Sequence, residues 1–262
     1  MANAIIRHVQ DINLAIKNSV FVRMMKLKKL FILILCLNFF ACTSMQNRHE
    51  AVVADPDKAG ISRLAKSDVN EVIEYHQRAA IRYLKELMIK LYYRNPSGRH
   101  DIKQRSIEAS VDRMFSYPHD AGYAQWQHMN ANDIVRIALD ETYQGTDRVL
   151  PFIFGLRKMI MASYDDHTAF FYLTSIDGQK LYNSARNIEI AAWMLAEKHD
   201  INGNLLIVSD SLADEQRNLS YQRLFGKIIA TQDNLAEIVA RKEGRLIKSV
   251  VINAASMMFL PI

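Results

Sequence analysis

The sequence predicts an all-α fold, a multi-helix bundle of about six to eight helices joined by a few short extended connectors. From residue 68 onward, apolar side chains recur at three- and four-residue steps, which places them on one face of an α-helix. This pattern is divided into separate segments by polar residues at helix starts and by Pro- or Gly-containing breakers at helix ends. The chain has no repeat at the periods of helical solenoids, so we expect a bundle.

The first predicted helix begins at Asp68, because Glu71 three residues later completes a capping box that satisfies free backbone donors. Its apolar stripe contains Ile73, Ala80, Leu84, Leu87 and Leu91. The breaker sequence NPSG at 95–98 ends this helix. A second helix is expected over 102–115 and a third over 132–145.

The segment VLPFIFGLRKMIMASY, residues 149–164, is apolar enough to invite a membrane interpretation. It is shorter than the roughly 20 apolar residues that a membrane-spanning helix needs, and it contains two charges. We therefore predict a core helix, with Arg157 and Lys158 directed away from its apolar face. Pro151 is tolerated in the first turn, and Gly155 either admits a neighbouring helix or is simply a weak helix former.

Three further helices are predicted over 177–199, 220–243 and 245–259. The first of these has a seam of Leu181, Ala185, Ile188, Ala192 and Leu195. Two short apolar runs, 169–175 and 204–210, are bounded by turn formers. They either pair as a small ribbon or form extended connectors within the bundle, and we favour the connectors.

Residues 24–41 have the features of an export signal. Three lysines precede an apolar run of about 12 residues, which is too short to span a bilayer comfortably. The run ends in Phe-Phe-Ala directly before Cys42, which is similar to a bacterial lipoprotein signal, where the cysteine carries the lipid. We predict lipidation at Cys42, with an uncleaved anchor or plain secretion as alternatives. Thr43 at the next position resembles the sorting pattern for the outer membrane.

The predicted signal divides the chain into four parts. Residues 1–23 precede a signal that already begins well at Met24, and export signals normally stand at the start of a chain. We expect that the start codon was assigned too far upstream and that translation begins at Met24 or Met25. The alternative is that residues 1–23 form a cytoplasmic extension. Residues 42–66 are polar and irregular, as in a flexible tether, and 67–262 are expected to form a single helical domain.

Charge and cysteine content exclude several functions. The chain holds 33 Lys and Arg against 28 Asp and Glu. Residues 1–41 contain six of these bases and one of these acids, which leaves 27 of each in the remainder. A domain without net charge lacks the basic surface of a nucleic-acid binder, so we expect no nucleic-acid partner. Cys36 would leave with the signal and Cys42 would carry lipid, so neither a disulfide nor a cysteine nucleophile is expected.

No established catalytic or metal-binding motif is present. The nucleophile elbow, the dinucleotide fingerprint, the P-loop and H-E-x-x-H are all absent, and after Cys42 no two histidines lie three or four residues apart. We therefore predict no metal, cofactor or catalytic residue. His-Asp pairs begin at His100, His119 and His199, but each lies at a predicted helix end or turn, where polar residues serve structure.

The sequence LYNSARNIEIAAWML, residues 181–195, is the most unusual local feature. Beyond Asn187 it is apolar on nearly every side, which predicts a central helix enclosed by others. Asn183 and Arg186 share a turn with Asn187, and a buried guanidinium needs acceptors. The candidate acceptors are Asp233, Glu237 and Glu189. These residues form either a polar network that fixes helix register, which we favour, or an anion-binding arginine flanked by two amides.

The segments LYNSARNIEIAAWML, NLSYQRLFGKIIATQDNLA and FLPI resemble a family of uncharacterised proteobacterial lipoproteins, from about residue 70 onward. The resemblance implies a helical lipoprotein and brings no established activity. We expect a periplasm-facing lipoprotein of the bacterial envelope, in the outer membrane, that acts as a structural or interaction scaffold and is not an enzyme. Its partners would be the membrane, through the lipid, and another envelope protein. The alternative is a small-ligand-binding or envelope hydrolase domain with Arg186 near its site.

Overall fold

The structure is a computed structural model. It describes residues 68–119, 121–171, 174–209, 212, 215–216, 218–249 and 258–262. The predicted upstream segment 1–23, signal peptide 24–41 and tether 42–66, with the lipidation residue Cys42, lie outside the described residues.

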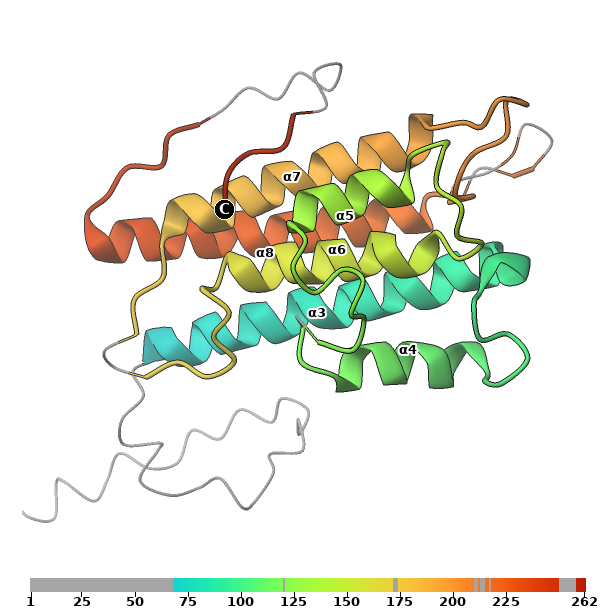
Figure 1. Cartoon of the computed structure of the whole chain (residues 1–262). Coiled ribbons are helices and arrows are strands. Elements are labelled where there is room, and N and C mark those ends of the chain that lie inside the picture. Colours follow the sequence, from blue (N-terminus) through green and yellow to red (C-terminus); the bar gives the residue numbers. More distant parts are fainter. Residues whose placement is uncertain are drawn as a thin grey trace, which may run out of the picture. The chain divides into compact units, whose positions relative to one another are not determined.

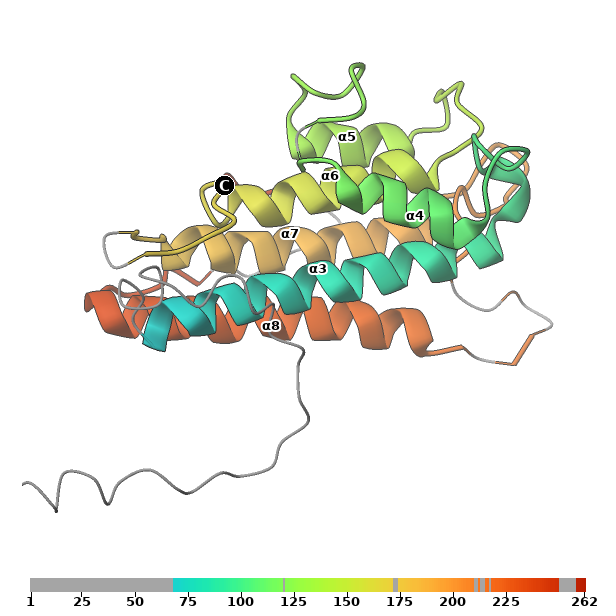
Figure 2. The ribbon, with the colours of Figure 1, turned by 90° about the horizontal axis from the view of Figure 1, so that it is seen from below.

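The described part of the chain is built from α-helices, which confirms the predicted all-α bundle. The helices are α3 (Asp68–Arg94), α4 (Ile107–Ser116), α5 (Ala131–Ala138), α6 (Val149–Ala162), α7 (Gly178–Glu197) and α8 (Ser220–Glu243), with a 3-10 turn η2 (Pro96–Gly98) after α3. Figure 1 shows α3, α6, α7 and α8 running side by side along one direction, with the shorter α4 and α5 outside them. Figure 2 shows that α5 covers α6 on the side away from α8. The described residues contain no strand, only an isolated bridge between His199 and Leu205.

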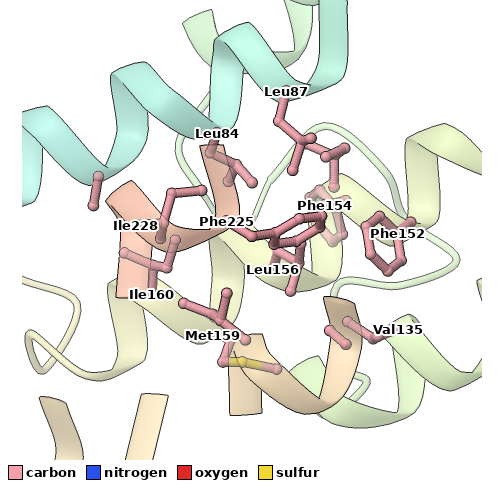
Figure 3. Packing of buried hydrophobic residues seen from close by; sticks show 14 of the residues in the cluster. Leu84, Leu87, Val135, Phe152, Phe154, Leu156, Met159, Ile160, Phe225 and Ile228 are labelled. Atoms are coloured by element: carbon pink, nitrogen blue, oxygen red, sulfur yellow. The ribbon is translucent and has the colours of Figure 1, made fainter. Parts of the chain in front are cut away.

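Helix α6 is the most completely buried helix of the bundle. Of its 14 residues, 12 are buried, so apolar side chains point into the core in every direction. Helices α3, α5 and α7 pack directly against it. Figure 3 shows Leu87 of α3, Val135 of α5, Phe152 and Phe154 of α6 and Phe225 of α8 gathered in this core. A helix that is apolar all round must be enclosed in this way.

The sequence prediction for Arg157 was wrong, because this side chain is buried and does not point to solvent. Only 8% of Arg157 is exposed. Its guanidinium donates hydrogen bonds of 2.7 and 2.8 Å to the carbonyl oxygens of Met114 and Tyr117. These carbonyls lie at the C-terminal end of α4, where backbone acceptors have no partner within the helix. Arg157 therefore ties α4 to α6, and the cation lies at the negative end of the α4 dipole.

Gly155 marks the closest approach between α5 and α6. A methyl group built on Gly155 would lie 2.8 Å from Cγ2 of Val135 and 3.0 Å from the carbonyl oxygen of Ala131. Backbone atoms are among these neighbours, so the space cannot be made by turning a side chain. The glycine sets the distance between the two helices.

Two predicted helices differ from the observed ones at their ends. The helix expected over 102–115 begins instead after Ser106, whose hydroxyl accepts a 3.1 Å hydrogen bond from the Ala109 amide. The helix expected to reach residue 145 ends at Ala138. Just beyond it, the Asp140 carboxylate accepts a 2.7 Å hydrogen bond from the Thr142 amide, which forms a turn in place of another helical turn.

The helix predicted over 245–259 is wrong for residues 245–249 and 258–259, which form neither helix nor strand, while 250–257 lie outside the described residues. Gly244 ends α8 in the left-handed conformation, with φ of 65°. The amides of Gly244 and Arg245 donate to the carbonyls of Arg241 and Ala240. These bonds satisfy the last carbonyls of α8 and turn the chain away from the helix axis.

We predict that Gly155→Ala lowers the free energy of unfolding by about 1 to 3 kcal/mol, because α5 must shift to admit the methyl group. Gly226→Ala is the matched control, since Gly226 lies in α8 with no neighbouring atom within 4 Å of the added carbon. That substitution should raise the free energy of unfolding by about 0.5 to 1 kcal/mol through helix propensity. Urea denaturation measures both variants, and equal stabilisation by the two would contradict the close contact.

Candidate functional site

Helix α7 carries most of the polar residues that the sequence analysis singled out. It begins where the Asp177 carboxylate accepts a 2.8 Å hydrogen bond from the Gln179 amide, a side-chain N-cap. Gln179, Asn183 and Asn187 follow at four-residue steps and therefore share one face of the helix. Arg186 lies off this face. The helix thus presents two polar surfaces that meet different parts of the chain.

Arg186 forms an ion-pair cluster where α7 meets α8. Its Nη2 lies 2.6 Å from Oδ2 of Asp233 and 3.0 Å from Oε1 of Glu189. The guanidinium also lies over the Tyr182 ring, 5.0 Å from its centroid. The side chains of Arg186, Asp233 and Glu189 are 17%, 32% and 37% exposed, so the cluster is partly desolvated. The structure brings together the predicted pair Arg186 and Asp233.

Burial dominates the electrostatics of this cluster. It raises the pKa of the Asp233 carboxyl more than the neighbouring Arg186 lowers it. Burial likewise raises the pKa of Glu189, again against the effect of Arg186. Both acids are therefore held in a site that disfavours their charged form, and Arg186 is the cation that makes this tolerable.

Asn183 and Asn187 do not face Arg186's partners but bind the last residues of the chain. Nδ2 of Asn187 donates to the Leu260 carbonyl at 2.9 Å, and Oδ1 of Asn187 accepts from the Leu260 amide at 2.6 Å. Nδ2 of Asn183 donates to the Pro261 carbonyl at 2.8 Å. Both amides are buried, and the backbone of 260–261 satisfies them. They are therefore not available to flank an anion at Arg186.

A second buried network joins α6, α7 and α8, and the sequence analysis missed it. Gln232 of α8 is fully buried. Its Oε1 accepts from the Tyr164 hydroxyl at 2.7 Å, and its Nε2 donates to the hydroxyls of Ser163 and Ser184 at 3.0 and 3.1 Å. Burial raises the pKa of Tyr164, which stays a neutral donor. The network joins three segments that are remote in sequence, namely Ser163 and Tyr164 after α6, Ser184 in α7 and Gln232 in α8, so no local pattern reveals it.

His100 pairs with a carboxylate distant in sequence and not with its neighbour Asp101. Its Nδ1 donates to Oδ2 of Asp147 at 2.7 Å, and the Tyr92 hydroxyl donates to the same oxygen at 3.0 Å. Oδ1 of Asp147 accepts from the Leu150 amide in the first turn of α6. The hydrogen bond to Asp147 raises the pKa of His100, and burial opposes this only in part. The pair joins α3, the turn after it and the start of α6.

Two surface cavities formed by described residues are not lined by Arg186. A groove of about 360 Å³ is lined by His76, Asn234, Glu237, Ile238 and Arg241, which belong to α3 and α8. A smaller cavity of about 190 Å³ borders the end of α8. Among the described residues, no group of three or more His, Cys, Asp or Glu side chains is placed to hold a metal ion. None of the helices described has the length and apolar character to cross a bilayer.

Comparison with known protein families, with curated proteins and with solved structures finds no match to this chain.

We predict that Arg186→Ala lowers the free energy of unfolding by about 2 kcal/mol, because it leaves two partly buried carboxylates without their cation. Asp233→Asn in the same background should recover part of this loss by removing one of the two like charges. Chemical denaturation at pH 7 measures the single and double variants.

Arg241→Ala is the control for Arg186→Ala, because Arg241 pairs with Glu237 on the surface and its side chain is 83% exposed. This control should leave stability nearly unchanged. If Arg186→Ala is as stable as the control, Arg186 does not hold α7 and α8 together.

The His100 pair predicts a pH dependence of stability. The folded-state pKa of His100 is raised above its unfolded value, so the contribution of protonated His100 is fully present below about pH 6.5. That contribution is lost as pH rises through the folded-state pKa. The difference in free energy of unfolding between wild type and His100→Gln should therefore shrink between pH 5 and pH 9. In an Asp147→Asn background the same comparison should show little pH dependence, and a persistent trend would assign the effect elsewhere.

Proposed function

We propose that the chain is a lipid-anchored protein of the bacterial envelope whose helical domain faces the periplasm as an interaction scaffold. The anchor would be Cys42, which follows a lysine-flanked apolar signal at 24–41. Thr43 favours the outer membrane over the inner one. The partners would be the membrane, through the lipid, and another envelope protein.

The observation that supports a scaffold most directly is the use of the polar residues on α7. Arg186 contacts two carboxylates, and the amides of Asn183 and Asn187 hold the backbone of 260–261. A small-ligand site needs convergent polar groups that remain open to the ligand. Because the chain itself satisfies these groups, they are not open to a small ligand, and we therefore favour contacts with partner proteins over a ligand-binding domain.

We propose the groove between α3 and α8 as a surface for such contacts. Ile238, which lines it, is 37% exposed, and Tyr75 beside it is 59% exposed. The Tyr75 ring packs edge to face on His76, another lining residue, at 5.9 Å between centroids. Exposed apolar side chains at the rim of a concavity are typical of protein interaction sites.

We expect a palmitate analogue fed to bacterial cells that produce the full chain to label the wild type, and Cys42→Ser to abolish the label. Full labelling of Cys42→Ser would refute the lipid anchor.

In the same cells, a photo-crosslinker at Tyr75 or Ile238 should give a discrete crosslinked species. The matched positions are Ile201 and Leu246, which are 92% and 94% exposed and lie outside the groove. A crosslink that is equal at all four positions would reject the groove as the contact surface.

A further inference from the structure

The polar face of α7 binds extended backbone through three side-chain amides. We call Gln179, Asn183 and Asn187 the amide ladder. At its first rung, Nε2 of Gln179 donates to the Lys248 carbonyl at 3.2 Å and Oε1 accepts from the Lys248 amide at 2.8 Å. At its last rung, Asn187 exchanges the same two bonds with Leu260. The amide ladder therefore binds the backbone of residues that form no helix.

The donor and acceptor pattern of the ladder fits a dipeptide that ends in proline. Asn187 uses both its donor and its acceptor on Leu260, which has both a carbonyl and an amide N–H. Asn183 only donates to Pro261, which has no N–H to offer. The remaining oxygen of Asn183 accepts from Gln179 at 2.9 Å, which fixes the amide with its donor toward Pro261. Proline also holds the residue before it in an extended conformation.

An aromatic side chain completes the bound segment. Phe259 is 9% exposed and belongs to the hydrophobic core. Its ring lies 5.2 Å from the Arg136 guanidinium of α5, a cation–π contact. The bound segment therefore follows the order aromatic, any residue with an N–H, proline. Figure 1 shows the end of the chain lying along α7.

We propose that the amide ladder is a binding site for extended aromatic-X-Pro segments of a partner protein, and that Phe259-Leu260-Pro261 is an internal ligand which such a segment displaces. The recognition uses backbone bonds and one aromatic ring, so it does not depend on the identity of the middle residue. The internal ligand competes at a high effective concentration because it belongs to the same chain. Binding in trans is therefore strong only when the internal segment is weakened.

In the full chain, Leu260→Pro weakens the binding of the internal segment to α7 by removing a single hydrogen-bond donor. Proline has no N–H and cannot donate to Oδ1 of Asn187. The Leu260 side chain is only partly buried, so the substitution removes little core packing. We expect a labelled peptide with the sequence MFLPI, that of residues 258–262, to bind this variant about tenfold or more tightly than wild type. Fluorescence anisotropy measures both titrations.

Two matched controls assign the binding to the ladder. The peptide MFPPI, which lacks the same N–H, should bind the Leu260→Pro chain about tenfold more weakly than MFLPI. Adding Asn187→Ala to that chain should abolish the gain, whereas Asn204→Ala, at an exposed asparagine in a surface turn, should preserve it. Equal binding to all of these chains, or no binding to the Leu260→Pro chain, overturns the proposal.

A second measurement needs no change in the segment. Hydrogen exchange of the Leu260 amide should be slow in wild type and about tenfold faster or more in Asn187→Ala. Fast exchange in wild type would overturn the proposal even if Leu260→Pro fails to fold. The proposal adds a second contact surface, on α7, to the scaffold and gives the class of segment that it binds, and so it rests on the proposed function. The peptide titration uses the purified chain, however, and can fail while lipid labelling at Cys42 succeeds.

Discussion

The burial of α6 on every side is the constraint on which the rest of the bundle depends. Phe152, Ile153, Phe154, Leu156 and Ile160 are all fully buried, and together they present apolar surface around the whole helix. No single neighbour can cover such a helix, so α3, α5 and α7 must all contact it. The glycine at 155 lets α5 approach closely enough to close one of these sides. The other helices take their places around α6 because the hydrophobic effect drives its enclosure.

Enclosing α6 also buries polar groups, and each of those described above has a partner within the chain. Arg157 donates to carbonyls at the end of α4, Gln232 bonds three hydroxyls, and Asp147 accepts from His100 and Tyr92. A buried polar group without a partner costs more than the bond itself contributes, so these contacts select one packing among many of similar apolar content. The polar groups thus fix how the helices are set against one another.

Helix α7 divides its polar side chains between two tasks. Arg186 pairs with Asp233 of α8 and with Glu189 of its own helix, whereas the amide ladder binds the backbone of Lys248 and of residues 260–261. The first arrangement is ionic and joins two helices. The second arrangement binds backbone atoms, so its hydrogen bonds do not involve the side chain of Leu260. The proposed recognition of partner segments would need a rigid row of amides, and a long helix packed on α8 supplies that rigidity.

The sequence by itself determined the class of fold and the starts of most helices, although α4 begins five residues later than its apolar pattern predicts. The start of α7 near residue 177 and the full extent of α8 follow from local patterns, because a helix boundary signal or a periodic stripe acts within a few residues. The sequence also marked Arg186, Asn183 and Asn187 as residues with unusual polar requirements. Local pattern failed at residue 245, where the left-handed Gly244 ends α8 although apolar residues continue.

Only the tertiary structure decided the partners of the polar residues. The sequence around Arg157 is typical of an exposed residue, yet its guanidinium binds the carbonyl oxygen of Tyr117, 40 positions away in the chain. The amide of Asn187 meets Leu260, and that of Gln232 meets hydroxyls from two other segments. Side-chain hydrogen bonds of this kind act over about 3 Å in space and carry no sequence periodicity. Their assignment therefore requires the packed bundle, which places segments remote in sequence against one another.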